Sequence, residues 1–171
     1  MKIYDNVLDK QFLDYINHSL LKMKWDIHYS DHGQKTPLFF NSATIDKNVQ
    51  KDEFIFLFDI IASIIEKEPD VEPEIKGKNI FLERGYVNLY PYGIGGNWHV
   101  DSDFINPRTI LYYPSDWKEE YGGATEFQES GEKVEYIKNR LLVFDGKLSH
   151  RSAVHQNPKN RYTIAFKINI E

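Results

Sequence analysis

Strand-forming residues dominate one stretch near the C-terminus, Arg161-Tyr162-Thr163-Ile164-Ala165-Phe166-Lys167-Ile168. Successive side chains of a β-strand point to opposite faces, so the polar residues Arg161 and Thr163 share one face and the apolar residues at even positions share the other. If the apolar face packs on the core, Arg161 and Thr163 face a cavity.

Similar short runs rich in Val, Ile, Tyr and Phe recur through the second half of the chain, with Gly, Pro and Asn between them. Many short strands with such turns predict an antiparallel sandwich or jelly roll. We expect this core to occupy residues 78–171 and its strands to span residues 86–90, 109–113, 124–127, 134–137, 141–144 and 162–168.

The first part of the chain, about residues 1–77, has helical periodicity instead. Apolar spacing predicts one helix from Val7 to Met23, with Asp9 as its N-cap, and a second from about Asp52 to Lys67. The second helix is apolar around most of its circumference, so it should be well buried. We therefore expect a single domain over 1–171, mainly β, with N-terminal helices packed on the outer face of one sheet.

Composition and charge narrow the function classes. The chain has 171 residues, which suits one domain, and 41% are hydrophobic, enough for a packed interior. Its 21 Lys and Arg against 26 Asp and Glu give a net charge of −5, which disfavours nucleic acid as the main partner. The absence of cysteine excludes disulfides, thiolate metal sites and cysteine nucleophiles. With no membrane-length apolar run and no signal peptide, we expect a cytoplasmic protein.

The histidines are the strongest candidates for metal chemistry. We expect three of them at the surface: His18, His28 and His32. The tripeptide His99-Val100-Asp101 differs, because side chains two apart on a strand face the same side and so place an imidazole beside a carboxylate. These are two of the three ligands of a facial metal triad. His150 and His155 are the candidates for the third.

Arg161 also points to a ligand. A desolvated guanidinium is costly unless an anion pairs with it, so an inward Arg161 suggests a bound acid or an internal salt bridge to Asp or Glu. Asn88 and Tyr90 share one face of the strand 86–90. They would offer an amide and a hydroxyl to a small polar ligand, unless they belong to an ordinary polar sheet surface.

In order and spacing, these segments resemble the iron(II)- and 2-oxoglutarate-dependent dioxygenases, nearest to the prolyl-4-hydroxylase-like branch of bacteria and their viruses. The family pattern is H-x-D, a distal histidine, and then a basic residue ten or eleven positions further on. His150 lies 49 residues after Asp101 and 11 before Arg161, whereas His155 would leave only 6. The resemblance covers roughly residues 80–168 and rests on Gly85–Gly93, His99–Asp101, Thr109–Tyr113, Trp117, Gly122–Phe127, His150 and Arg161–Phe166.

The resemblance implies a double-stranded β-helix, or jelly-roll, core. It implies that His99, Asp101 and His150 bind Fe(II), and that Arg161 binds the C5 carboxylate of 2-oxoglutarate. The implied reaction consumes O2, releases succinate and CO2, and hydroxylates a peptide or protein side chain or a small molecule.

Further contacts to the cosubstrate are implied in the same way. Tyr90 matches a tyrosine that contacts 2-oxoglutarate in prolyl hydroxylases. Asn88 together with Tyr90 also matches the N-x-Y pattern of the DNA-alkylation-repair demethylases. Thr163 and Thr125 are weaker cosubstrate candidates.

Three departures from the family concern the substrate. Many prolyl hydroxylases have Lys where Arg161 stands, and several have a tyrosine where this chain has Gly96. Repair demethylases have a second arginine after the distal histidine that we do not find here. A nucleic-acid demethylase is therefore disfavoured.

Two other interpretations stay open. The first is a jelly-roll metalloenzyme of cupin type that uses no 2-oxoglutarate, in which Arg161 would have no acid partner. The second is a non-catalytic jelly roll that binds carbohydrate or peptide on an aromatic platform made of Trp98, Tyr112, Tyr113 and Trp117.

Overall fold

The computed structural model describes residues 1–29, 38–46, 49–50, 55–67, 78–102 and 104–170. Its α-helices are α1 (Lys10–Lys22) and α2 (Ile55–Lys67), and η1 (Glu119–Tyr121) is a single 3-10 turn. Asp9 caps α1 as predicted, because its side chain accepts a 2.9 Å hydrogen bond from the backbone N–H of Phe12. The predicted start of the second helix at 52–54 lies outside the described residues, as does His32.

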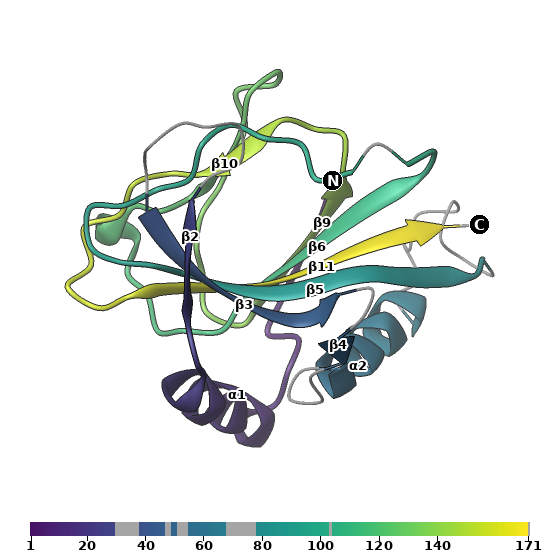
Figure 1. Ribbon diagram of the computed structural model, residues 1–171, viewed down its shortest axis with the longest axis horizontal. Coiled ribbons are helices and arrows are strands. Elements are labelled where there is room, and N and C mark those ends of the chain that lie inside the picture. Colours follow the sequence, from purple (N-terminus) through teal and green to yellow (C-terminus); the bar gives the residue numbers. More distant parts are fainter. Residues whose placement is uncertain (30–37, 47–48, 51–54, 68–77, 103, 171) are drawn as a thin grey trace.

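The strands form two antiparallel sheets (Figure 1). The large sheet has the order β1-β9-β6-β11-β5-β3-β2, with β4 paired to β3, and the small sheet has the order β10-β7-β8. The large sheet contains β1 (Lys2–Asp5), β2 (Asp26–Tyr29), β3 (Leu38–Asp46), β4 (Val49–Gln50), β5 (Ile80–Tyr90), β6 (Pro107–Tyr113), β9 (Arg140–Asp145) and β11 (Arg161–Ile170). The small sheet contains β7 (Thr125–Phe127), β8 (Lys133–Val134) and β10 (His150–Ser152).

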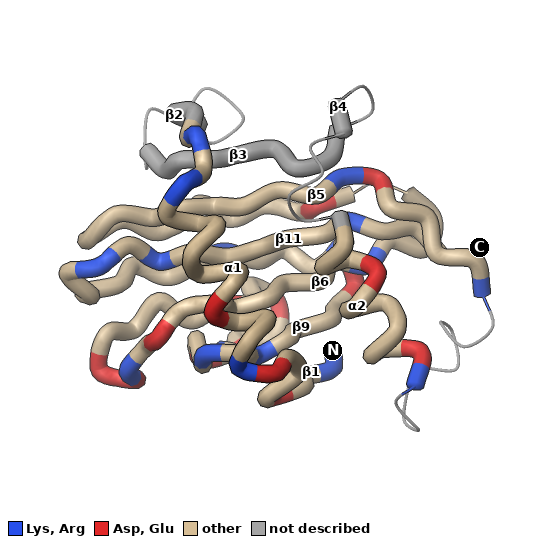
Figure 2. Tube along the Cα trace, turned by 90° about the horizontal axis from the view of Figure 1, so that it is seen from below, with Lys and Arg blue, Asp and Glu red and all other residues tan. Residues whose placement is uncertain are grey.

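The large sheet separates two hydrophobic clusters, and β9 shows how. Leu141 and Val143 join the cluster that contains the buried residues of α1 and α2, whereas Leu142 and Phe144 join the cluster on the opposite face. Figures 1 and 2 show both helices on one side of the sheet. The helices therefore cover the outer face, as predicted, and the inner face is turned toward the small sheet.

The N-terminal part of the chain is not purely helical, contrary to the expectation for residues 1–77. It contributes β1, β2, β3 and β4 to the large sheet. β1 has only four residues and pairs with β9 near the other end of the sequence, through Lys2↔Val143 and Asp5↔Arg140. Such a short strand is stabilised by its distant partner, and its own sequence carries little signal.

Two strands, β5 and β8, differ most from their predicted bounds. β5 begins at Ile80 instead of Tyr86, because β11 pairs with it as far as Ile170↔Ile80. β8 (Lys133–Val134) ends at Val134 instead of Ile137, because β7 pairs with it through two residue pairs, Thr125↔Val134 and Glu126↔Lys133. Pairing with neighbours, and not local propensity, sets both lengths.

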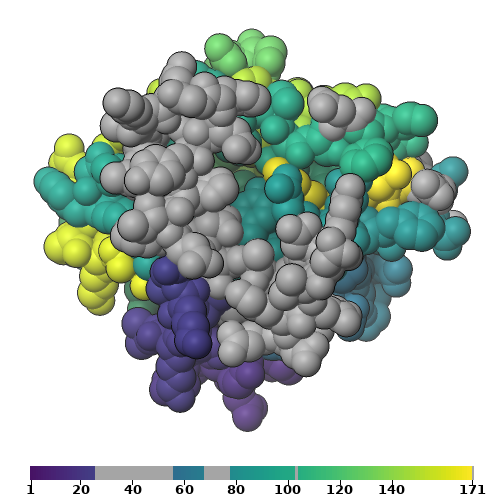
Figure 3. Space-filling view, in the orientation of Figure 1, coloured from purple at the N-terminus to yellow at the C-terminus, as the bar shows by residue number. Residues whose placement is uncertain are grey.

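The purple to dark-blue stretch that includes α1 lies at one edge of the molecule in the space-filling view, as α1 does in Figure 1 (Figure 3). Among the described residues, neither helix is long and apolar enough to cross a membrane.

Candidate functional site

His99 and His150 are held together by their own backbones. They form an isolated antiparallel bridge in which His99 N donates to His150 O at 3.1 Å and His150 N donates to His99 O at 2.9 Å. Their ring centroids are 4.4 Å apart. Asp101 completes the group, because one ligand atom from each of the three residues lies within 4.8 Å of the others. Residues far apart along the chain are thus brought together, and we call His99, Asp101 and His150 the triad.

Each imidazole is oriented by a main-chain carbonyl. Nδ1 of His99 lies 2.9 Å from Asn97 O, and Nδ1 of His150 lies 2.9 Å from Leu148 O. A carbonyl oxygen can only accept, so Nδ1 carries the proton and Nε2 keeps its lone pair. The two Nε2 atoms lie 3.5 and 3.4 Å from the carboxylate oxygens of Asp101. Both nitrogens are therefore available to a metal ion beside that carboxylate.

Asp101 is buried, with one carboxylate oxygen in a hydrogen bond and the other in an ion pair. Thr109 Oγ1 donates a 2.6 Å hydrogen bond to Oδ2, and Lys167 Nζ lies 2.8 Å from Oδ1. Burial alone would raise the pKa of Asp101, but the hydrogen bond that His99 donates when both of its ring nitrogens are protonated, the charge of a protonated His150 and the charge of Lys167 lower that pKa far below its usual value. Asp101 is therefore an anion throughout the neutral pH range.

The two histidines titrate differently. Burial is the largest influence on His150 and lowers its pKa. Burial acts in the same direction on His99, but the hydrogen bond and charge of Asp101 outweigh it and raise the pKa of His99.

Two imidazoles and one carboxylate are a donor set suited to ferrous iron with open positions, so the triad could hold that ion.

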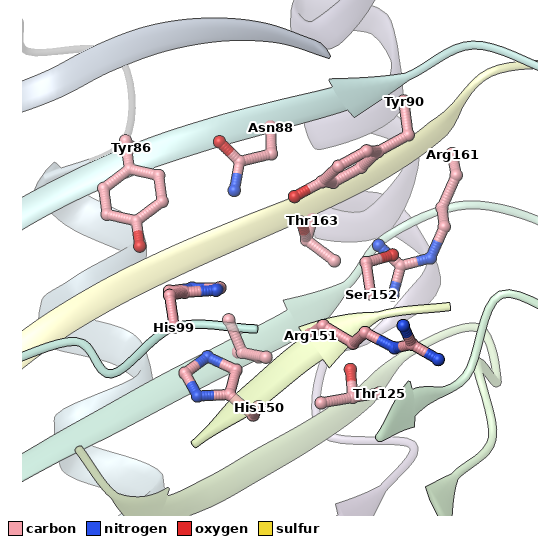
Figure 4. A pocket seen from close by; sticks show the side chains of 11 residues that line it. Tyr86, Asn88, Tyr90, His99, Thr125, His150, Arg151, Ser152, Arg161 and Thr163 are labelled. Atoms are coloured by element: carbon pink, nitrogen blue, oxygen red, sulfur yellow. The ribbon is translucent and has the colours of Figure 1, made fainter. Parts of the chain in front are cut away.

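A pocket between the two sheets lies beside the triad (Figure 4). It has about 330 Å³ of empty space, part of it open to solvent. Figure 4 shows the side chains of Tyr86, Asn88 and Tyr90 of β5 along one wall, with the triad histidines opposite. The lining residues are Tyr86, Asn88, Tyr90, His99, Leu111, Thr125, His150, Arg151, Ser152, Arg161 and Thr163.

Arg161 is the buried cation of this pocket. It is only 1% exposed, and its Nε donates to Gly123 O at 2.9 Å. Three tyrosine rings surround the guanidinium: Tyr136 at 5.0 Å, Tyr90 at 5.5 Å and Tyr113 at 5.8 Å. Nη2 is buried without a hydrogen-bond partner, and no carboxylate among the described residues pairs with Arg161. Aromatic faces attract a cation but leave its N–H groups unsatisfied, so the pocket is suited to an anion here.

Gly123 allows this arrangement. Its φ is +77°, and a Cβ there would lie 3.0 Å from His155 Cβ and 3.2 Å from Arg161 Cδ. A larger residue would be strained and crowded, so glycine lets the chain pass close enough to offer its carbonyl to Arg161.

Strand pairing brings the expected cosubstrate residues together. β11 and β5 are paired through Arg161↔Tyr90 and Thr163↔Asn88, so the four side chains form two adjacent rows on the inner face. Burial raises the pKa of Tyr90 to about 12, so its phenol keeps its proton and can donate a hydrogen bond. Thr125 approaches from β7, and its hydroxyl lies 2.7 Å from the Tyr113 hydroxyl.

His155 lies apart from the triad. It is fully buried, its Nε2 lies 2.9 Å from Tyr90 O, and its ring packs on Trp117 with 5.3 Å between centroids. Of the two candidates for third ligand, the fold therefore brings His150 to His99 and Asp101. His18 is exposed on α1, as expected, and His28 lies on β2.

Two residues that contact the candidate metal ligand Asp101 were missed by sequence reasoning. Thr109 and Lys167 both contact Asp101 and lie opposite each other in the β6–β11 pairing. The alternation of β11 is a signal that could have found Lys167, because it lies on the same face as Arg161 and is 7% exposed.

No protein-family model matches this chain, and no curated protein matches it. Solved structures do. The chain is similar to a prolyl hydroxylase from Trichoplax adhaerens in complex with a hypoxia inducible factor peptide fragment, at 17% identity and a TM-score of 0.72, covering 98% of this chain and 82% of that one.

Two other solved structures are similar over nearly the whole chain. One is the viral collagen prolyl hydroxylase of Paramecium Bursaria Chlorella virus-1 in a 2-oxoglutarate complex, at 14% identity, a TM-score of 0.62 and coverage of 98% and 94%. The other is HygX from Streptomyces hygroscopicus with nickel, 2-oxoglutarate and hygromycin B bound, at 13% identity, a TM-score of 0.69 and coverage of 98% and 81%. This chain therefore has the fold of prolyl hydroxylases and of a metal- and 2-oxoglutarate-binding protein, in agreement with the resemblance found in its sequence.

Proposed function

We propose that this protein is an Fe(II)- and 2-oxoglutarate-dependent dioxygenase, and that its two sheets form a double-stranded β-helix. One observation carries the proposal: a single pocket is lined by two histidines of the triad and by a buried guanidinium with an unsatisfied N–H. A metal ligand set beside a carboxylate receptor is what a chelating keto diacid requires.

The residues of the pocket would divide the work. His99, Asp101 and His150 would hold the iron on one face and leave its remaining positions to 2-oxoglutarate and O2. Arg161 would pair with the C5 carboxylate and so fix the cosubstrate in one orientation. When bound, iron and 2-oxoglutarate supply the oxidising chemistry that adds oxygen to the substrate, with release of succinate and CO2.

The neutral polar residues would complete the cosubstrate site. Tyr90, protonated because of burial, would donate a hydrogen bond to a cosubstrate carboxylate. Asn88, Thr163 and Thr125 line the same pocket and would offer further hydrogen bonds. Together these groups would replace the water shell of a dianion that enters a buried site.

For the primary substrate, we propose a peptide or protein side chain, or a small molecule. The similar structures support both kinds, because one holds a peptide fragment and another holds hygromycin B. The cytoplasmic location expected from the sequence stays a prediction.

The competing interpretations are less well supported. A cupin-type enzyme without 2-oxoglutarate gives no reason for a buried Arg161 with no carboxylate partner among the described residues. For a binding module, the supposed aromatic platform is mostly inside the protein. Tyr112 and Tyr113 are 0% exposed and Trp117 packs on Tyr136, which leaves Trp98 at 37% exposure.

Anaerobic titration of Fe(II) and 2-oxoglutarate tests the proposal. We expect a visible charge-transfer band in the wild type and its loss in His150→Ala. His18→Ala is the matched control, because it removes an exposed imidazole from α1, and it should keep the band. Metal binding without the band or succinate formation would favour the cupin-type enzyme, and the absence of metal binding would overturn the proposal.

A further inference from the structure

Lys167 is a buried cation beside the metal ligand Asp101, at a position that the sequence analysis did not predict as part of the site. It follows Arg161, Thr163 and Ala165 on the inner face of β11 and is 7% exposed. A buried lysine is destabilising unless a partner compensates the loss of its hydration. The partners of Lys167 therefore indicate why a charge is kept at this position.

Both polar contacts of Lys167 among the described residues are to Asp101. Its Nζ lies 2.8 Å from Asp101 Oδ1 and donates to Asp101 O at 3.2 Å. It also lies 5.3 Å from the ring centroid of Tyr86, which lines the pocket. The ammonium is thus placed against the one anionic member of the triad.

Orientation of the carboxylate does not require this charge. Thr109 already donates a 2.6 Å hydrogen bond to Oδ2, and Asp101 N donates to Gly146 O at 2.9 Å. An uncharged residue at position 167 would avoid the desolvation of an ammonium. Compared with an uncharged residue at position 167, Lys167 therefore changes the net charge at the metal centre.

Without Lys167, the triad would carry a charge of −1 from Asp101. With the ammonium beside Oδ1, the ligand set and its neighbour sum to zero, so a bound divalent ion keeps its full positive charge. Asp101 and Lys167 are both buried, so one charge at this range acts strongly on both the metal and any anion on it.

We propose that Lys167 tunes the charge of the metal centre, weakening its hold on the divalent ion and strengthening its hold on the dianionic cosubstrate. This inference rests on the proposed function, because it concerns the same triad. Lys167 acts through Asp101 and touches neither ligand in this role. Its removal should strengthen the affinity for the divalent ion and weaken the affinity for 2-oxoglutarate. A residue that only supports the fold would weaken both.

The test measures Mn(II) binding by calorimetry and then 2-oxoglutarate binding to the Mn(II)-loaded protein, in wild type, Lys167→Met and Lys167→Gln. We expect Mn(II) to bind about tenfold tighter and 2-oxoglutarate about tenfold weaker in both neutral variants. Lys167→Arg keeps the charge and should stay near the wild type. Thr109→Val is the matched control, since it removes an uncharged bond to the same carboxylate, and it should not give the opposed pair of shifts.

The outcomes separate the two proposals. The wild-type protein could bind Mn(II) and 2-oxoglutarate while Lys167→Met has unchanged affinities or weaker affinities for both. That result would overturn this inference and leave the proposed function standing. Wild-type protein that binds no Mn(II) would overturn the proposed function. Melting curves of the metal-free proteins check folding, and if neither neutral variant folds, Lys167 is a structural residue and the inference is wrong.

Discussion

Replacing Arg161 by Met should remove 2-oxoglutarate binding while sparing the metal. The guanidinium is 1% exposed, has an unsatisfied Nη2 and has no carboxylate partner among the described residues, so its expected partner is the cosubstrate. A hydrogen bond to a charged group contributes about 1.5–3 kcal/mol, and truncating one partner of a buried charge pair costs about 2–5 kcal/mol. Taking about 3 kcal/mol, 2-oxoglutarate should bind about 100-fold more weakly.

The assay compares two affinities and one melting temperature. Calorimetry should give an almost unchanged Mn(II) affinity for Arg161→Met and a greatly weakened 2-oxoglutarate affinity. Because the variant removes a buried cation that lacks an anion, the ligand-free protein should melt no lower than the wild type. Added 2-oxoglutarate should raise the melting temperature of the Mn(II)-loaded wild type but not that of the variant.

Arg161→Lys is the informative control. It keeps a positive charge among the tyrosine rings but loses the Nε bond to Gly123 O, so its affinity for 2-oxoglutarate should lie between those of the wild type and Arg161→Met. Equal losses of metal and 2-oxoglutarate affinity in Arg161→Met would refute the reasoning, because Arg161 would then support the fold and not the cosubstrate.

Three further predictions concern the metal, the core and the small sheet. Asp101→Ala should abolish 2-oxoglutarate turnover with circular dichroism unchanged, and a chelator should do the same to the wild type; persisting turnover would remove the triad from the mechanism. Phe166→Ala, at a fully buried position, should lower the free energy of unfolding in urea by about 3–5 kcal/mol; a loss below about 1 kcal/mol would contradict the packing. The hydrogen bond from Lys133 is the largest influence on Glu126 and lowers its pKa from 4.5. Its contribution to stability is therefore present above about pH 4.5 and lost as the pH falls through the folded value, so Glu126→Gln should differ from the wild type, by under about 1 kcal/mol, at neutral pH only.

Part of the site could be predicted from the sequence because Arg161, Thr163, Asn88 and Tyr90 stand on two strands with clear alternation. The alternation of β11 predicts that Arg161 and Thr163 share a face, and the structure has both in the pocket. The same rule places Asn88 and Tyr90 together on β5. Local backbone geometry decides these relations, so a single segment contains the information.

Other features depend on partners that are distant in the sequence. β1 is a strand because β9 is available to pair with it, and the sequence Lys2–Asp5 by itself gives no such signal. Strand alternation in the sequence leaves both His150 and His155 open as the third ligand, and only the bridge between His99 and His150 brings one of them to Asp101.

By itself, the sequence determined the β-rich core, the two helices and which side chains share a strand face, because these follow from periodicities within single segments. The tertiary structure alone decided which strands are neighbours, and so which charges meet. The contact of Lys167 with Asp101 is the clearest case, since the energy of a buried ion pair depends on a distance of 2.8 Å between residues on separate segments. No local pattern in the chain encodes that distance.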